Sequence, residues 1–267
     1  MHHTWNTSAN EYNRFEKKWH YYERVAERLV KALPTVSDSN VLELACGTGA
    51  CTILLSRLAK KGRVTAIERS PAMLKLAKQN VKTARQSNVS FIHGDVRDLS
   101  ALVRGKKFDV VACNSALWQF PEQENLMRDL YVTLGEGGVL AFNIPIWFRS
   151  KKESLDYRKT VDGVLSKHNI DTAEFWRKRR PIDYPSLLSA YAFSVIKDVR
   201  YSVDMQVLER KEWRLIPIFA RRWGVFRDLP KEVAHEIRRE VDLKTRSWPE
   251  NRDTKSRWRL ILARTIR

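Results

Sequence analysis

Nine residues near the start of the chain read Val41-Leu42-Glu43-Leu44-Ala45-Cys46-Gly47-Thr48-Gly49. The apolar run that opens this stretch predicts a short buried strand of a parallel sheet, because turn-forming residues bound it on both sides. Glycines at 47 and 49 permit a tight turn and let backbone N–H groups approach a ligand at the start of the next helix, expected at residues 51–58. The stretch therefore predicts a strand, a turn and a helix with a ligand site at the turn.

The same alternation of strands and helices continues to about residue 146. Further strands are expected at residues 64–67, 89–92, 108–113 and 138–143, with helices at residues 11–31, 72–84 and 122–133. Strands that alternate with helices of this length predict right-handed βαβ units and a parallel sheet with helices on both faces. Ligands of such doubly wound α/β domains bind beyond the carboxyl ends of the strands.

Polar side chains follow three of these strands. Glu68 ends the second strand, 19 residues beyond Gly49, where a carboxylate can bind both hydroxyls of a ribose. Asp95 follows the third strand, where a carboxylate can accept a hydrogen bond from an adenine amine, and Asn114 follows the fourth. Each residue alone also suits an ordinary turn or helix cap. Their shared position at the ends of successive strands favours a nucleoside-binding site.

A nicotinamide dinucleotide is the obvious rival ligand. The pattern Gly-x-Gly-x-x-Gly that such a ligand favours would need a third glycine at the position that Thr52 occupies. The sequence therefore disfavours a dinucleotide and leaves other nucleoside-containing cofactors.

The ordered set of motifs resembles the class I S-adenosylmethionine-dependent methyltransferases. Residues 41–49 are similar to the glycine-rich first motif of that family, and residues 108–111 and 134–140 are similar to its fourth strand and to the turn into its fifth. The resemblance runs from about Tyr12 to Pro145. One departure is Ala45, where many members have Gly, and this variant keeps the end of the strand small. The resemblance implies S-adenosyl-L-methionine as the cofactor and S-adenosyl-L-homocysteine as the product.

The resemblance also implies roles for individual residues. Glu43 and residues 45–49 would hold the methionine part of the cofactor, Glu68 would hold the ribose, and Tyr12 would cover the cofactor from the N-terminal helix. The complete implied cofactor site comprises Tyr12, Glu43, Ala45, Cys46, Gly47, Thr48, Gly49, Glu68, Arg69, Met73, Asp95, Val96, Asn114, Ser115 and Trp118.

The adenine would lie between two of these side chains and against two others. The resemblance implies that Arg69 and Met73 flank the ring, while the Asp95 carboxylate and the Val96 backbone amide bind its polar edge. These four residues thus complete the nucleoside half of the expected site.

Methyl transfer from a sulfonium is an in-line displacement in which positive charge leaves sulfur. In the resemblance, Asn114 and Trp118 would border the sulfonium and the acceptor. Alignment of the acceptor and exclusion of water can supply about 7–11 kcal/mol, and a general base is needed only if the acceptor loses a proton. The sequence identifies no catalytic base by spacing; His20, Tyr21 and His93 are the candidates that it offers.

The sequence after residue 146 interrupts the expected fold twice. Helical segments are expected within residues 147–180, at residues 187–193 with Tyr184-Pro185-Ser186 as the helix start, and at residues 231–241, and strands at residues 195–205 and 257–264. The chain is therefore expected to form a doubly wound, mostly parallel seven-stranded sheet with helical insertions after strands five and six. Residues 1–40 would form an N-terminal helical lid, residues 41–146 the cofactor-binding core, and residues 147–267 the substrate-covering insertions plus the last strands. Aromatic residues expected around an enclosed acceptor pocket are Trp19, Tyr22, Trp118, Trp147, Trp176 and Trp213.

Charge leaves the acceptor class open. The chain of 267 residues has a net charge of +18. Residues 1–146 carry 20 Lys+Arg and 14 Asp+Glu, a net +6, whereas residues 147–267 carry 29 and 17, a net +12, together with six of the nine tryptophans. Such a half can bind nucleic acid, an anionic surface or an acidic small molecule.

A small-molecule acceptor, of an anionic kind among others, is the preferred hypothesis. The sequence shows no RNA-binding module and no Asn-Pro-Pro-Tyr or Asp-Pro-Pro-Tyr after the fourth strand. A tRNA or rRNA methyltransferase that uses the basic half is the alternative. A cofactor-binding partner protein without catalytic activity is the third hypothesis.

The remaining features concern compartment and metal. Cys46, Cys51 and Cys113 are odd in number and lack metal-ligand spacing, which predicts reduced thiols and no metal site. The sequence has no run of about 20 apolar residues and no signal-peptide core at its start. We expect a cytoplasmic protein that is a monomer or a homodimer.

Overall fold

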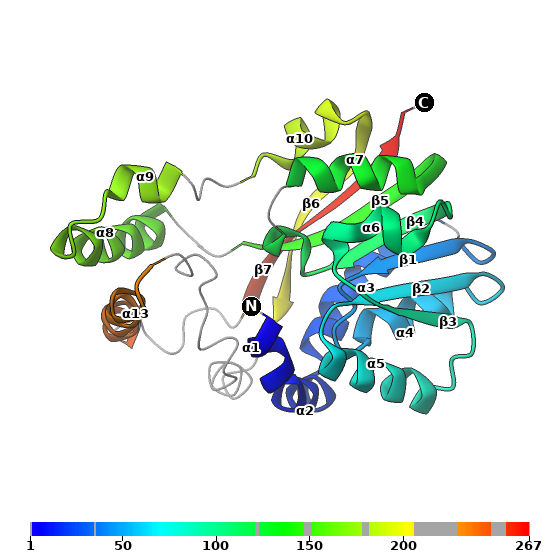
Figure 1. Cartoon of the computed structure of the whole chain (residues 1–267), viewed down its shortest axis with the longest axis horizontal. Coiled ribbons are helices and arrows are strands. Elements are labelled where there is room, and N and C mark those ends of the chain that lie inside the picture. Colours follow the sequence, from blue (N-terminus) through cyan, green and yellow to red (C-terminus); the bar gives the residue numbers. More distant parts are fainter. Residues whose placement is uncertain are drawn as a thin grey trace.

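One seven-stranded sheet forms the centre of the molecule. The computed structural model describes residues 2–34, 36–120, 123–146, 151–177, 182–205, 229–246 and 255–266. The strands are β1 (Asn40–Leu44), β2 (Arg63–Glu68), β3 (Val89–His93), β4 (Phe108–Asn114), β5 (Leu134–Ile146), β6 (Phe193–Asp204) and β7 (Lys255–Thr265). They lie in the order β3-β2-β1-β4-β5-β7-β6 (Figure 1). Neighbours among β1 to β5 are parallel, whereas β7 is antiparallel to β5 and β6. The predicted doubly wound, mostly parallel seven-stranded sheet is confirmed.

The helices follow the predicted alternation. They are α1 (His2–Thr7), α2 (Ala9–Trp19), α3 (Tyr21–Ala32), α4 (Ala50–Leu58), α5 (Pro71–Thr83), α6 (Leu99–Val103), α7 (Gln123–Thr133), α8 (Lys151–Lys167), α9 (Thr172–Arg177), α10 (Tyr184–Ala190) and α13 (Lys231–Arg246), with 3-10 turns η1 (Val96–Asp98) and η2 (Leu117–Gln119). Ser70 begins α5, because its hydroxyl accepts a hydrogen bond from the Met73 N–H at 3.2 Å. The helix expected to start at Tyr184-Pro185-Ser186 does begin at Tyr184, but its expected end at Phe193 is wrong, since α10 ends at Ala190 and Phe193 already belongs to β6.

The single N-terminal helix expected at residues 11–31 is also wrong. The helix is interrupted at His20, whose backbone φ of 52° is left-handed, and two helices, α2 and α3, form in its place. The Glu16 carboxylate accepts hydrogen bonds from the N–H groups of Tyr22 (3.0 Å) and Glu23 (2.7 Å), which have no partner within α3. The apolar pattern continues through this corner, because side chains of both helices, among them Phe15 and Tyr21, are buried in one cluster.

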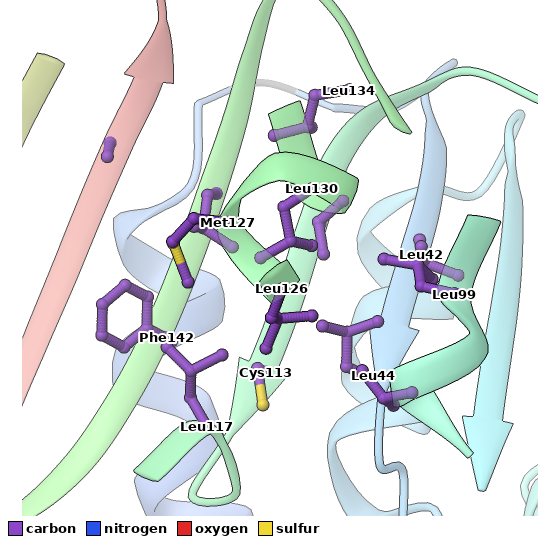
Figure 2. Packing of buried hydrophobic residues seen from close by; sticks show 14 of the residues in the cluster. Leu42, Leu44, Leu99, Cys113, Leu117, Leu126, Met127, Leu130, Leu134 and Phe142 are labelled. Carbon is purple, nitrogen blue, oxygen red and sulfur yellow. The ribbon is translucent and has the colours of Figure 1, made fainter. Parts of the chain in front are cut away.

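Apolar side chains cover both faces of the sheet. On one face, Leu42, Leu44 and Phe142 of the strands pack against α7, from which Met127 and Leu130 are fully buried (Figure 2). On the other face, the strands pack against α3 and α4. Burial on both faces explains why the strands contain long apolar runs, and it leaves the carboxyl edge as the place where polar side chains gather.

The two insertions form a small helical unit, defined here as α8, α9 and α13. Its cluster of buried side chains is drawn from these helices and includes Val161, Phe175 and Ile237. At its surface Glu236 accepts hydrogen bonds from Lys167 (2.6 Å) and His168 (2.8 Å), which ties α13 to α8. The helical unit lies beyond the carboxyl end of β5 (Figure 1). Across the ranges that the structure describes, no helix is long and apolar enough to cross a membrane.

Candidate active site

The turn between β1 and α4 takes the strained shape that its glycines predict. Ala45, Gly47 and Gly49 all have positive φ, of 52°, 57° and 89°. A side chain at Gly49 would meet the Ala77 Cα at 3.3 Å, so glycine lets α4 and α5 approach closely there. A Cβ at Gly47 would meet nothing within 4 Å. The turn therefore exposes backbone at position 47, as a ligand that binds main-chain groups requires.

Two carboxylates lie buried beside this turn. Glu43 is 1% exposed, and its Oε2 accepts a hydrogen bond from the Thr52 hydroxyl at 2.5 Å. Burial raises the pKa of Glu43 to about 7. Glu68 is 7% exposed and accepts hydrogen bonds from the N–H groups of Gly47 (3.0 Å) and Ser70 (2.8 Å). Burial also raises the pKa of Glu68. Both side chains have oxygen acceptors held in place for a donor.

Asp95 has a different environment. Its carboxylate binds the Arg97 guanidinium at 2.9 Å and lies 3.6 Å from that of Arg69, and it also accepts the Arg97 N–H at 3.0 Å. Burial alone would raise the pKa of Asp95, but the hydrogen bonds from Arg97 outweigh it and hold the pKa at about 2. Asp95 is therefore an ionised acceptor at every physiological pH.

A small pocket opens between the turn and the N-terminal helices. Its volume is about 40 Å³, room for roughly three water molecules. Its lining residues are Tyr12, Tyr22, Glu43, Ala45, Cys46, Gly47, Thr48, Ala50, Cys51 and Asn114. The structure thus brings together eight of the residues that the sequence analysis singled out, from four separate segments. Ala50 and Cys51 were missed, although they directly follow the quoted turn.

Helices α2 and α3 contribute Tyr12 and Tyr22 to the lining of this pocket, while α1 and α2 are hydrogen-bonded to Ser70 and α5. The ring of Tyr12 stacks on that of Tyr22 with centroids 5.5 Å apart. Asn6 Oδ1 accepts a hydrogen bond from the Ser70 hydroxyl at 2.5 Å. Asn13 Oδ1 accepts one from the amide of Asn80 at 2.8 Å. No pattern in the sequence indicated these asparagine contacts, because they join segments far apart in the chain.

The remaining predicted cofactor residues are not among those that line the pocket. Met73 and Val96 are buried, Gly49 caps α4, and the Glu68 carboxylate accepts a hydrogen bond from the Gly47 N–H of the turn. Ser115 has a φ of 64° directly after β4.

Trp118 and Trp19 are partly buried, in η2 and α2 respectively. Trp19 packs against the aromatic cluster of the N-terminal helices. Trp147 and Trp213 lie outside the described residues, as does the side chain of Trp176 in α9.

The three candidate bases do not line the pocket. His20 is exposed at the corner between α2 and α3 and pairs with Glu23 at 2.5 Å. Tyr21 is buried with its ring 6.2 Å from that of Trp258. His93 is exposed, and its Nε2 donates to the Arg69 carbonyl at 3.0 Å. Among the residues with described positions, no group of three or more His, Cys, Asp or Glu side chains could hold a metal ion.

Comparison with known proteins gives a consistent result. A family model described as "Methyltransferase domain" matches residues 35–175. Demethylmenaquinone methyltransferase of Listeria welshimeri is 32% identical over 125 residues, which are 44% of this chain and 52% of that protein. Trans-aconitate 2-methyltransferase of Paracidovorax citrulli is 33% identical over 143 residues, 54% of this chain and 51% of that protein. The chain spans about half the length of these curated relatives.

A solved structure extends the likeness to the fold. The YcgJ protein of Bacillus subtilis shares the fold with a TM-score of 0.57 at 13% identity, over 91% of this chain and 99% of that chain.

Proposed function

The chain belongs to the class I methyltransferases, matched by their domain model over slightly more than half of its residues, and on that premise we propose that it transfers a methyl group from S-adenosylmethionine to a small-molecule acceptor. One observation carries this proposal: the buried carboxylates of Glu43 and Glu68 flank a glycine turn at the carboxyl edge of the sheet. A carboxylate buried with no ligand costs free energy, so its retention favours a ligand that supplies donors.

The donors and acceptors of the site fit this cofactor. Glu43 would accept hydrogen bonds from its amino group, and Glu68 would accept them from the ribose hydroxyls. Backbone exposed at Gly47, where a Cβ would meet no atom within 4 Å, leaves space for the methionine part. The ionised Asp95 would accept a hydrogen bond from the adenine amine.

The nucleoside needs more room than the pocket offers. Sites for ligands of this size measure about 300–1,000 Å³, whereas the pocket holds about 40 Å³. Asn6 accepts hydrogen bonds from the Ser70 hydroxyl and the Ala72 N–H, and Asn13 accepts one from Asn80, so that hydrogen bonds join α1 and α2 to α5. We therefore propose that α1 and α2 move away from α5 when the cofactor enters.

The residues of the site would act mainly by holding the cofactor and the acceptor in position. The bound cofactor supplies an already activated methyl group on a cationic sulfur. Tyr12 and Tyr22, stacked over the pocket, would exclude water and form a wall against which an acceptor packs. Asn114 at the end of β4 would border the reacting groups. Holding two reactants at near-attack distance needs no general base unless the acceptor must lose a proton.

The acceptors named for the two curated relatives support a small-molecule acceptor for this chain. The names of the two curated relatives give them small-molecule acceptors, demethylmenaquinone and trans-aconitate. The aromatic wall that Tyr12 and Tyr22 form is in keeping with such an acceptor. A test on metabolite and RNA fractions of a cell extract, with cofactor labelled on its methyl group, separates this acceptor class from RNA: label in the RNA fraction alone would contradict it.

Cofactor binding itself is tested by calorimetry with S-adenosylhomocysteine. We expect the unmodified chain to bind it, and Glu68→Gln to weaken binding about tenfold or more, since the neutral amide accepts weaker hydrogen bonds than a carboxylate. The matched control is Glu136→Gln, which changes an exposed glutamate at the start of β5. No binding by the unmodified chain would overturn the proposal.

A further inference from the structure

A buried amide network lies behind the pocket wall. Asn143 on β5 is fully buried, and its Nδ2 donates to Oδ1 of Asn114 (2.9 Å) and to the Val25 carbonyl of α3 (3.2 Å). Its Oδ1 accepts the hydroxyl of Tyr201 on β6 at 3.0 Å. Asn114 in turn donates its Nδ2 to the Tyr22 carbonyl at 3.2 Å. The network therefore joins three strands to the helix that carries Tyr22.

The register of the sheet sets up this network. Asn114 and Asn143 are direct partners on the parallel strands β4 and β5, so their side chains lie beside each other on one face. In the same row Asn143 pairs with Leu260 of β7, and Leu260 pairs with Val199 of β6. Tyr201 lies two residues beyond Val199 and so has the same face. That face is the one on which α3 packs.

The hydrogen bonds leave Asn143 with one amide orientation. Both hydrogens of its Nδ2 and its Oδ1 have partners, so that three of the four hydrogen bonds open to an amide are made. If the amide turned over, its oxygen would face the Val25 carbonyl, and two acceptors would meet. The backbone of α3 therefore dictates the orientation of Asn143, and Asn143 dictates that of Asn114.

We infer that Asn143 and Tyr201 are positioning residues for the methyl-transfer site, acting through Asn114. Asn114 lines the pocket, whereas neither Asn143 nor Tyr201 does. With Oδ1 of Asn114 held by Asn143, its Nδ2 is directed to Tyr22, and the two pocket residues form one fixed wall. A buried amide costs free energy that an apolar side chain of similar size would avoid. The amide of Asn143 is explained by the need to orient the amide of Asn114, which lines the pocket.

This inference rests on the proposed function, and its test uses the binding of S-adenosylhomocysteine by the whole chain. Asn143→Asp keeps the shape but removes the amide that donates to Asn114. We expect affinity to fall about fivefold to tenfold, and Tyr201→Phe to lower it about threefold. Tyr131→Phe is the control for Tyr201→Phe, because it removes a tyrosine hydroxyl that donates a hydrogen bond to a carbonyl oxygen, that of Ile266, and Tyr131 does not line the pocket. Its affinity should equal that of the unmodified chain.

A double variant distinguishes positioning from mere support of the fold. In an Asn114→Ala background, Asn143→Asp should cause no further loss of affinity, whereas its effect on the melting temperature should persist. If Asn143→Asp fails to fold, Tyr201→Phe is combined with Asn114→Ala and judged in the same way. Unchanged affinity in the single variants, or an equal loss with and without Asn114, would overturn the inference. Absence of binding by the unmodified chain would instead overturn the proposed function.

Discussion

Two regions of the molecule treat their carboxylates in opposite ways. At the turn after β1, Glu43 is 1% exposed, its hydrogen bonds come from neutral side chains such as Thr52, and burial raises its pKa to about 7. In the helical unit, Glu236 binds Lys167 and His168, and the hydrogen bonds from these two side chains lower the pKa of Glu236 to about 2. The pairing of Glu236 supports the fold, whereas the isolation of Glu43 opposes it. The difference supports our proposal that Glu43 is the carboxylate that binds a ligand.

The clusters of buried apolar side chains in the sheet and in the helical unit also differ. The larger cluster joins the strands to α7 and α10 over much of the sheet, and a fold with a core of that size can bear the cost of a buried carboxylate. The helical unit is held together by a smaller cluster of buried side chains between α8, α9 and α13. It is therefore expected to be the more easily unfolded region.

The largest expected effect is on the helical unit. Ile237→Ala removes a fully buried side chain from its cluster and should cost about 2–5 kcal/mol. Hydrogen exchange should show faster exchange in α8 and α13, with unchanged affinity for S-adenosylhomocysteine. Leu243→Ala, on the same helix but 52% exposed, is the control and should change stability little. A matching loss of cofactor affinity in Ile237→Ala would show that the regions are coupled.

The next effect separates ligand binding from stability at the turn. Glu43→Gln keeps an acceptor for Thr52 but removes the buried charge. We expect affinity for S-adenosylhomocysteine to fall by about 2–3 kcal/mol, because a charge-assisted bond to its amino group is lost. The free energy of unfolding without ligand should stay constant or rise. Calorimetry and denaturant unfolding measure the two quantities, and a variant that binds as well as the unmodified chain would contradict the assignment.

Binding should also depend on pH through Glu43. With a pKa of about 7, this carboxyl is mostly protonated at pH 6 and mostly ionised at pH 8 in the free chain. Since a cationic amino group binds the ionised form, affinity should rise about tenfold between these pH values. Without ligand the sign is opposite: the folded chain holds a proton that an unfolded one releases above about 4.5, so this group's contribution to stability falls as pH rises from there to about 7. The pH dependence of affinity and that of stability should both be weaker in Glu43→Gln. Identical pH profiles for this variant and the unmodified chain would contradict the prediction.

The smallest effect concerns Glu236. Its lowered pKa means that its ion pairs stabilise the folded chain above its ordinary pKa of 4.5, and that this contribution is lost as pH falls toward about 2. Glu236→Gln should therefore lower the melting temperature slightly at pH 7 and not at pH 2. Arg239 and Glu240, which pair at the surface of the same helix, supply a control in Glu240→Gln, for which a still smaller change is expected. Equal changes at both pH values would contradict the role of the ion pairs.

Local patterns predicted the turn and the strand ends better than they predicted the helices around them. The turn at residues 45–49 and the acidic residues at the ends of β2 and β3 were located because each belongs to a short segment whose strand end is visible in the sequence. The corner at His20 was not, since neither glycine nor proline marks it and the stabilising carboxylate of Glu16 looks like any other charged helix residue. The contacts of Asn13 and Asn143 likewise join distant segments and have no local signal.

The sequence by itself determined the alternation of strands and helices, the glycine turn and the row of polar side chains at strand ends, because apolar periodicity and turn chemistry act over a few residues. Tertiary structure alone decided that α2 and α3 bring Tyr12 and Tyr22 to the pocket, that α8 pairs with α13, and that Asn143 and Tyr201 orient Asn114. These outcomes depend on which buried donors and acceptors meet across the fold. That matching is a property of the packed chain, and no short stretch of sequence contains it.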